Sequence, residues 1–120
     1  MTDYSPKYKP GQAIPMVATG AITGGLMSTV AGATAAADSV TWLGVASQDA
    51  IAGQTYAAYC DGVQRLTASA AVAAGAIVKC AAAGQVVTWV TGTDPFERAV
   101  GIALEAAAGA ASVFAVKMFR

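Results

Sequence analysis

The sequence contains no histidine and few charged residues. Histidine is the commonest general base of enzymes and the commonest zinc ligand, so its absence removes the most frequent catalytic and metal-binding arrangements. The 7 acidic residues are scattered, and none has the spacing of a calcium-binding loop. We therefore expect a protein with no catalytic activity, no cofactor and no bound metal.

Charge is scarce and balanced. Only 12% of the 120 residues are charged, and 7 basic residues offset 7 acidic ones, whereas an ordinary soluble domain is about 25% charged. This excludes the basic footprint of a nucleic-acid-binding protein. The 56% of hydrophobic residues include many alanines, which predicts a smooth, weakly polar surface suited to packing on another protein or on further copies of the chain.

Long hydrophobic runs are absent. The longest weakly polar stretch, residues 68–87, is interrupted by Ser69, Lys79 and Gln85 and is apolar mainly through alanine, so it is a poor membrane span. Residues 1–7 show no basic start followed by an apolar stretch. We expect no membrane partner and synthesis in the cytoplasm of the producing cell.

Cysteine is limited to Cys60 and Cys80, which have no second cysteine close by in the sequence. Zinc-finger and redox spacings are therefore absent, and we expect buried free thiols. A disulfide between the two residues is the alternative, if their strands are neighbours and the protein meets oxygen.

Two small sets of residues invite a functional interpretation. Asp94 and Glu97 flank Pro95 and would make a carboxylate pair for glycoside chemistry, but a turn followed by a solvated Glu97–Arg98 pair explains them better. Trp42 and Trp89 would suit a sugar or a base, although tryptophan inside a strand is usually core. We expect a structural role for all of them.

The most informative pattern is a unit that occurs twice. Residues 43–46 (Leu-Gly-Val-Ala) precede an Ala-Gly pair and the strand-like segment 55–59, and residues 100–103 (Val-Gly-Ile-Ala) precede Ala-Gly and 112–116. In each copy the first glycine stands where a side chain would obstruct a bend or a close backbone approach. The copies align with a one-residue slip, which we attribute to a shorter turn in the second. A duplicated β-hairpin element is typical of a scaffold.

Glycine recurs mostly every 8 to 12 residues, the spacing of turns in a β-sandwich or barrel. We predict an all-β fold, a small barrel or β-tulip-like domain over residues 14–120, with strands at 13–19, 26–30, 40–46, 55–60, 63–67, 76–80, 85–91, 99–104 and 112–119. Asp61-Gly62 suits a type I′ hairpin between two of them. Alanine clusters at 35–37, 68–74 and 106–108 favour one or two short helices.

Residues 1–13 differ from the rest, because they have neither a helical nor a strand period. We interpret them as an extended N-terminal arm whose aromatic side chains gain contact area on a partner. A frayed terminus without function is the alternative. The candidate binding residues of the arm are Tyr4, Pro6, Lys7, Tyr8, Lys9 and Pro10.

The last predicted strand is apolar on both faces. One face carries Phe114, Val116 and Met118, and the other ends at Phe119 beyond Lys117. A small β-domain usually leaves one face in water, so this strand indicates either a closed barrel with an extra covering layer or a subunit interface. The low charge of the chain favours the interface.

The order of these segments resembles that of the tailed-phage capsid cement proteins and, more distantly, the lambda-type head decoration proteins. The resemblance covers residues 10–119 and rests on the proline-containing arm, Ile14-Pro15-Met16-Val17-Ala18, the two Gly-centred strands with their Ala-Gly turns, residues 73–78 and residues 83–87. It implies small β-rich homotrimers on the outer surface of the phage head, which clamp neighbouring major capsid protein subunits, with an arm that orders on the capsid. Alternatives are another virion structural domain, such as a head fibre base or tail-associated domain, and a small ligand- or glycan-binding β-module.

Overall fold

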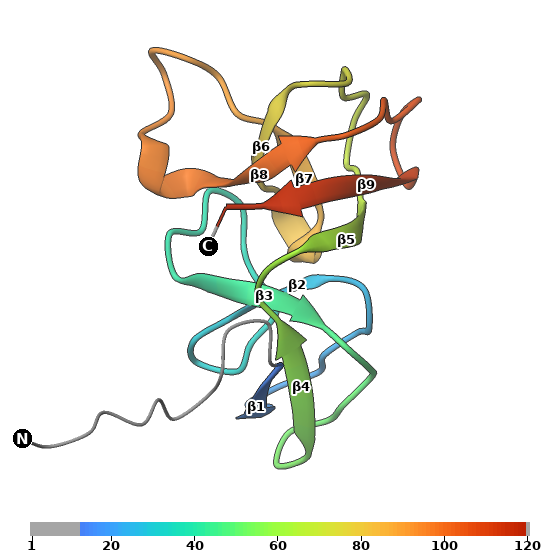
Figure 1. Ribbon diagram of the computed structural model, residues 1–120. Coiled ribbons are helices and arrows are strands. Elements are labelled where there is room, and N and C mark those ends of the chain that lie inside the picture. The colour runs from blue at the N-terminus through green and yellow to red at the C-terminus, as the bar shows by residue number, and fades with distance from the viewer. Residues whose placement is uncertain (1–12, 120) are drawn as a thin grey trace, which may run out of the picture.

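In the computed structural model, residues 13–119 are described, and nine strands form two antiparallel sheets (Figure 1). The first sheet has the order β1-β4-β3-β2 and the second β5-β9-β8-β6-β7. The strands are β1 (Ile14–Val17), β2 (Met27–Thr29), β3 (Trp42–Ala46), β4 (Thr55–Tyr59), β5 (Val63–Thr67), β6 (Ile77–Cys80), β7 (Val86–Thr88), β8 (Ala99–Ala103) and β9 (Val113–Met118).

The predicted all-β class is confirmed, but the helices expected at the alanine clusters do not form. Among the described residues the only helical segments are two 3-10 turns, η1 (Ala82–Gly84) and η2 (Phe96–Arg98). Each cluster instead contributes one alanine to the core, Ala35, Ala68 and Ala107, and Ala107 pairs with Val72 in an isolated bridge. Tertiary packing thus overrides the helix propensity of alanine.

The hairpin predicted at Asp61-Gly62 is wrong. β4 and β5 belong to different sheets, so this pair of residues carries the chain from the first sheet to the second. Gly62 does adopt the predicted positive φ, +75°, and its carbonyl accepts a hydrogen bond from the Met118 amide at 2.9 Å. Asp61 does not have the positive φ that a type I′ turn requires at both central residues, so both the predicted turn type and the predicted strand pairing are wrong.

The two sheets are built from one repeated unit. The two sheets have the same strand order when β1, β2, β3 and β4 are matched in turn with β5, β6, β8 and β9. The second sheet has one more strand, β7, at its edge. The registers agree as well, because Ser28 pairs with Gly44 just as Val78 pairs with Gly101. We call residues 14–60 the first repeat and residues 63–118 the second repeat.

Irregular features also recur in both repeats. The β2–β3 pairing shifts register after Ser28, and the β6–β8 pairing shifts after the equivalent Val78. Long-range bridges match too: Ile22 pairs with Ala50 in the first repeat as Val72 pairs with Ala107 in the second. Such agreement in both bulges and bridges extends the predicted duplication from one hairpin to the whole domain.

The one-residue slip between the copies has the opposite cause to the one expected. The β3–β4 loop runs over residues 47–54, eight residues, and the β8–β9 loop runs over 104–112, nine residues. The second turn is therefore longer by one residue. The difference is accommodated at Ala111, which has φ +67° at the position where the first repeat has Gly53, φ +89°.

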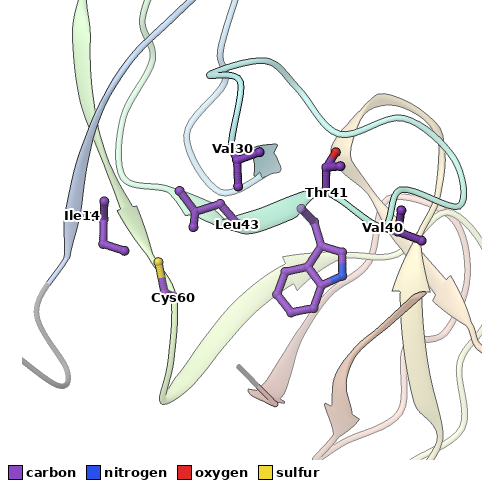
Figure 2. Close-up of a pocket in the computed structure, with 7 residues that line it drawn as sticks. Ile14, Val30, Val40, Thr41, Leu43 and Cys60 are labelled. Carbon is purple, nitrogen blue, oxygen red and sulfur yellow. The ribbon is translucent and has the colours of Figure 1, made fainter. Parts of the chain in front are cut away.

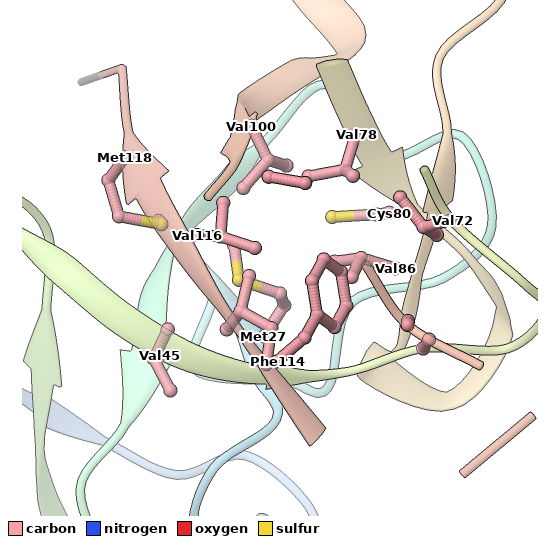
Figure 3. Packing of buried hydrophobic residues seen from close by; sticks show 14 of the residues in the cluster. Met27, Val45, Val72, Val78, Cys80, Val86, Val100, Phe114, Val116 and Met118 are labelled. Atoms are coloured by element: carbon pink, nitrogen blue, oxygen red, sulfur yellow. The ribbon is translucent and has the colours of Figure 1, made fainter. Parts of the chain in front are cut away.

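The main core lies between the repeats (Figure 3). Met27, Trp42 and Val45 of the first repeat share one cluster with the buried side chains of the second. We call the face of the first repeat that carries these three residues the covering face. A smaller core within the first repeat is built around Tyr56, with Ile22 and four alanines, Ala18, Ala46, Ala50 and Ala58. The apolar face of the second repeat is therefore shielded from water by the first repeat.

The interface expected on β9 is only partly at the surface. Phe114, Val116 and Met118 are at most 4% exposed and belong to the main core, so the prediction that they face another subunit is corrected: their partners are in the same chain. Strand alternation places Val113 and Lys117 on the exposed side. Of the four candidates, only Phe119, 40% exposed, reaches the surface.

Replacing Gly101 or Gly44 by alanine is expected to destabilise the fold by about 1–3 kcal/mol, the range of overpacked sites. The added Cβ would lie 2.3 Å from the carbonyl oxygen of Lys117 or 2.4 Å from that of Tyr59, and neither strand can retreat without losing its pairing. Gly109→Ala is the control, because nothing lies within 4 Å of its Cβ position. Urea denaturation measures the difference, and equal stability of the Gly101 and Gly109 variants would contradict the steric argument.

Candidate interaction surfaces

The first repeat carries an open apolar groove of about 520 Å³ (Figure 2). Its wall comes from the first residue of β1, from the loop between β2 and β3, from β3 and from Cys60, which follows β4. Val30 and Val40 are 58% and 46% exposed, whereas Trp42 lines the groove although it is only 3% exposed. The residues that line the groove are Ile14, Val30, Val40, Thr41, Trp42, Leu43 and Cys60.

The second repeat carries an aromatic patch made by Trp89, Phe96 and Phe119. Phe96 stacks on Phe119 with ring centroids 5.9 Å apart, and its ring meets Trp89 edge-on at 6.2 Å. Phe96 is nevertheless 66% exposed. Large aromatic side chains held in fixed positions at a surface are typical of protein–protein contacts.

The loop that presents Phe96 is fixed by the carboxylate of Asp94. Its Oδ1 accepts hydrogen bonds from Lys79 Nζ at 2.8 Å and from Arg98 Nη1 at 2.9 Å, and its Oδ2 accepts one from the Val90 amide at 2.9 Å. Lys79 also pairs with Asp38 at 2.8 Å. Because the Asp94 side chain is only 1% exposed, these contacts occur largely out of water and hold the loop rigidly.

This network sets two pKa values. The hydrogen bonds from Lys79 and then from Val90 and Arg98 outweigh burial and lower the pKa of Asp94 to about 2. The hydrogen bonds to Asp38 and then to Asp94 raise the pKa of Lys79 above its ordinary value. Both groups therefore stay charged over a wide pH range.

The turn expected at residues 92–95 forms, but the solvated Glu97–Arg98 pair expected after it is corrected by this geometry. Asp94 is buried, and Arg98 pairs with Asp94 rather than forming an exposed pair with Glu97. No local sequence pattern indicated that Asp94 is buried in a network of ion pairs, because Lys79 and Asp38 lie far from the loop along the chain.

The remaining candidates are separate from one another. Trp42 is core, as predicted, but Trp89 is half-buried and donates from Nε1 to the Pro95 carbonyl at 2.9 Å. Only Trp42 lines the groove, so the two rings do not flank one cleft. Cys60 and Cys80 are both free thiols, as expected; Cys80 is buried, and Cys60 is half-buried. Burial and the neighbouring Asp61 raise the pKa of Cys60.

The candidate arm residues Tyr4, Pro6, Lys7, Tyr8, Lys9 and Pro10 lie outside the described residues. Within residues 13–119, no three His, Cys, Asp or Glu side chains gather closely enough to hold a metal ion. No helix in that part of the chain is long and apolar enough to cross a membrane.

Asp94→Asn is expected to lower the free energy of unfolding at pH 7 and to flatten its dependence on pH below 4. The folded pKa of Asp94, about 2, lies below its ordinary value of 3.8, so its stabilisation is complete above pH 3.8 and is lost as the pH falls towards 2. Urea titrations at several pH values measure both effects. Asp61→Asn, at an exposed carboxylate, is the control, and identical pH profiles for the two variants would overturn the assignment.

Comparison with solved structures finds the N base of the head fibre protein gp8.5 of bacteriophage phi29, with a TM-score of 0.68 and 17% sequence identity over 90% of this chain and 93% of that chain. At this identity the likeness concerns the fold. Comparison with curated proteins finds no match. The family model of the phage cement proteins matches residues 8–118, nearly the whole chain, and this chain therefore belongs to the phage cement protein family.

Proposed function

We propose that this virion protein binds the outer surface of the phage head as a homotrimer and stabilises the capsid by clamping neighbouring major capsid protein subunits. Membership of the cement family supports a structural role in the virion. A protein bound across a junction stabilises only the assembled state that displays its site, so its effect on the capsid follows from binding alone and needs no catalysis.

The aromatic patch is the observation that carries the proposal. Phe96 is two-thirds exposed although it packs on two other rings, and the Asp94 network fixes its loop. A rigid aromatic anchor loses little conformational entropy on binding and becomes a hot spot when a partner buries it.

The N-terminal arm is proposed as the second contact with the capsid. Its tyrosines, Tyr4 and Tyr8, would bury aromatic area there, and three arms in a trimer would multiply weak contacts through avidity. Proline at Pro6 and Pro10 disfavours compact structure in the arm and favours an extended segment that can lie along a capsid strand.

A second candidate function is the base of a head fibre. The likeness to the gp8.5 N base over most of both chains favours it, because such a base also sits on a phage head. A glycan-binding module is less well supported, since Trp42 and Trp89 lie at different surfaces.

Phe96→Ser is expected to weaken binding to expanded heads at least about tenfold, because about 1.4 kcal/mol corresponds to one factor of ten and a buried aromatic anchor contributes more. The matched control is Ile51→Ser, which removes an equally exposed side chain, 65% against 66%, from a loop of the first repeat. Co-sedimentation with heads measures how much of each variant binds. Light scattering of the free protein is expected to show a trimer, unless the trimer assembles only on heads. A stable monomer that does not bind heads, or equal binding by both variants, would refute the proposal.

Deleting residues 1–9 is expected to leave the β-domain folded but to weaken capsid binding by orders of magnitude. Each tyrosine buried on the capsid contributes roughly 1.5 to 3 kcal/mol. Competition for heads between the full-length and truncated proteins tests this directly. Equal occupancy at equal concentration would mean that the globular body alone makes the contact.

A further inference from the structure

The groove of the first repeat occupies the position of a surface that is buried in the second repeat. Because Ser28 and Val78 are equivalent, the groove residue Val30 corresponds to Cys80. Val30 is 58% exposed, whereas Cys80 is 1% exposed. The same face is thus open in one repeat and closed in the other.

Two further pairs of residues show the same contrast. Gly44 is equivalent to Gly101, so the preceding groove residue Leu43 corresponds to Val100. The register of β4 and β9 makes Cys60 the counterpart of Met118. Leu43 and Cys60 are half-buried, whereas Val100 and Met118 are 0% and 4% exposed.

The closed face is covered by the part of the chain that precedes it. The cluster that contains Val100 and Met118 also contains Met27 and Val45 from the covering face of the first repeat, and Figure 3 shows Met27 among the buried side chains of the second repeat. By the same order, the chain that precedes the first repeat, residues 1–12, is in position to cover the groove.

A second copy of the chain is a poorer occupant. Stacking would require the face of the second repeat that corresponds to the covering face, where Lys79 stands at the position of Thr29. On this face Lys79 forms salt bridges with Asp94 and Asp38. Thr88 pairs with Val78 as Thr34 pairs with Ser28, so the loop before β8, residues 89–98, ten residues, corresponds to residues 35–41, seven residues, in the first repeat. The longer loop of the second repeat obstructs a stacked partner.

The N-terminal segment has the reach and the side chains to fill the groove. Ile14, the first residue of β1, is itself part of the groove wall, so the segment is tethered at the groove. Residues 4–10 span up to about 25 Å when extended, at about 3.3–3.6 Å per residue. A groove of about 520 Å³ is within the range of clefts that bury ligands of drug size, about 300–1,000 Å³. Tethering also gives the chain's own segment a high effective concentration.

We propose that, in the free protein, residues 4–10 dock in the groove of their own chain, with Tyr4 and Tyr8 as the apolar contacts. The inference concerns the protein without heads and does not rest on the proposed function. On a head, the capsid would compete with the groove for the same segment, and the apparent affinity of the arm for the capsid would be reduced by the fraction of arms that are docked.

Cys60 is a built-in probe of the docked state, because it lines the groove and is a free thiol. Its labelling rate with iodoacetamide at constant pH is expected to rise about tenfold when residues 1–9 are deleted, if the segment covers the groove nine-tenths of the time. Tyr4→Ser combined with Tyr8→Ser should raise the rate similarly. Mass spectrometry assigns the label, and buried Cys80 must remain unlabelled, which reports that each variant is folded.

The controls separate the tyrosines from the rest of the segment and the groove from the rest of the surface. Thr2→Ala with Ser5→Ala is expected to leave the Cys60 rate unchanged. Val30→Gln places a polar but uncharged side chain in the groove and should raise the Cys60 labelling rate in the full-length protein but not in the truncated one. Val17→Gln, at a residue 57% exposed outside the groove, should leave the rate unchanged in both proteins.

Equal Cys60 rates in the full-length and truncated proteins would overturn the proposal. Protection that disappears on dilution over about two orders of magnitude would also overturn it in favour of docking by the arm of a neighbouring copy, because an intramolecular contact does not depend on concentration. Docking in the chain's own groove is supported if the protection of Cys60 does not depend on concentration, is lost in the tyrosine double variant, and is also lost in Val30→Gln.

Discussion

The packing of the first repeat on the second is the interaction on which the rest of this structure depends. A single antiparallel sheet of four or five short strands has only one face to bury, and it needs a partner for that face. Here the second repeat supplies large side chains such as Phe114 and Met118, and the first supplies Met27, Trp42 and Val45 to cover them. The small core around Tyr56 holds mostly alanine, so most large buried side chains lie in the shared cluster. The two repeats are therefore expected to unfold together.

The candidate interaction surfaces lie where the two repeats differ from each other. If the two units were identical in all loops and in all contacts, each would show the same face to water. Instead, the second repeat has a longer loop, which the buried Asp94 carboxylate holds in place and which presents Phe96. The first repeat has an open groove at the face that is closed in the second repeat. Duplication supplied the scaffold, and the differences at its two ends supplied the surfaces for partners.

The sequence predicted features that depend on local backbone chemistry. The duplication was visible at Gly44 and Gly101 because a side chain there would strike the neighbouring strand, and the glycine spacing indicated an all-β fold. The interface on β9 was misassigned because alternation identifies an apolar face but not the molecule that covers it. At Asp61-Gly62 only the positive φ of Gly62 was predicted correctly, because a turn signal marks a change of direction and does not say which strand the chain pairs with next. The Asp94 network was missed because Lys79 and Asp38 are brought to it only by the fold.

The ion pairs behind the aromatic patch have a consequence for the environments that a virion meets. With a carboxylate that titrates near pH 2, a lysine whose pKa is raised, and no histidine in the chain, the support of Phe96 keeps one charge state through neutral, mildly acidic and mildly alkaline media. Attachment through this surface would therefore be a passive fastening without an acid trigger. Its timing would be decided by the moment at which the head first displays the complementary site.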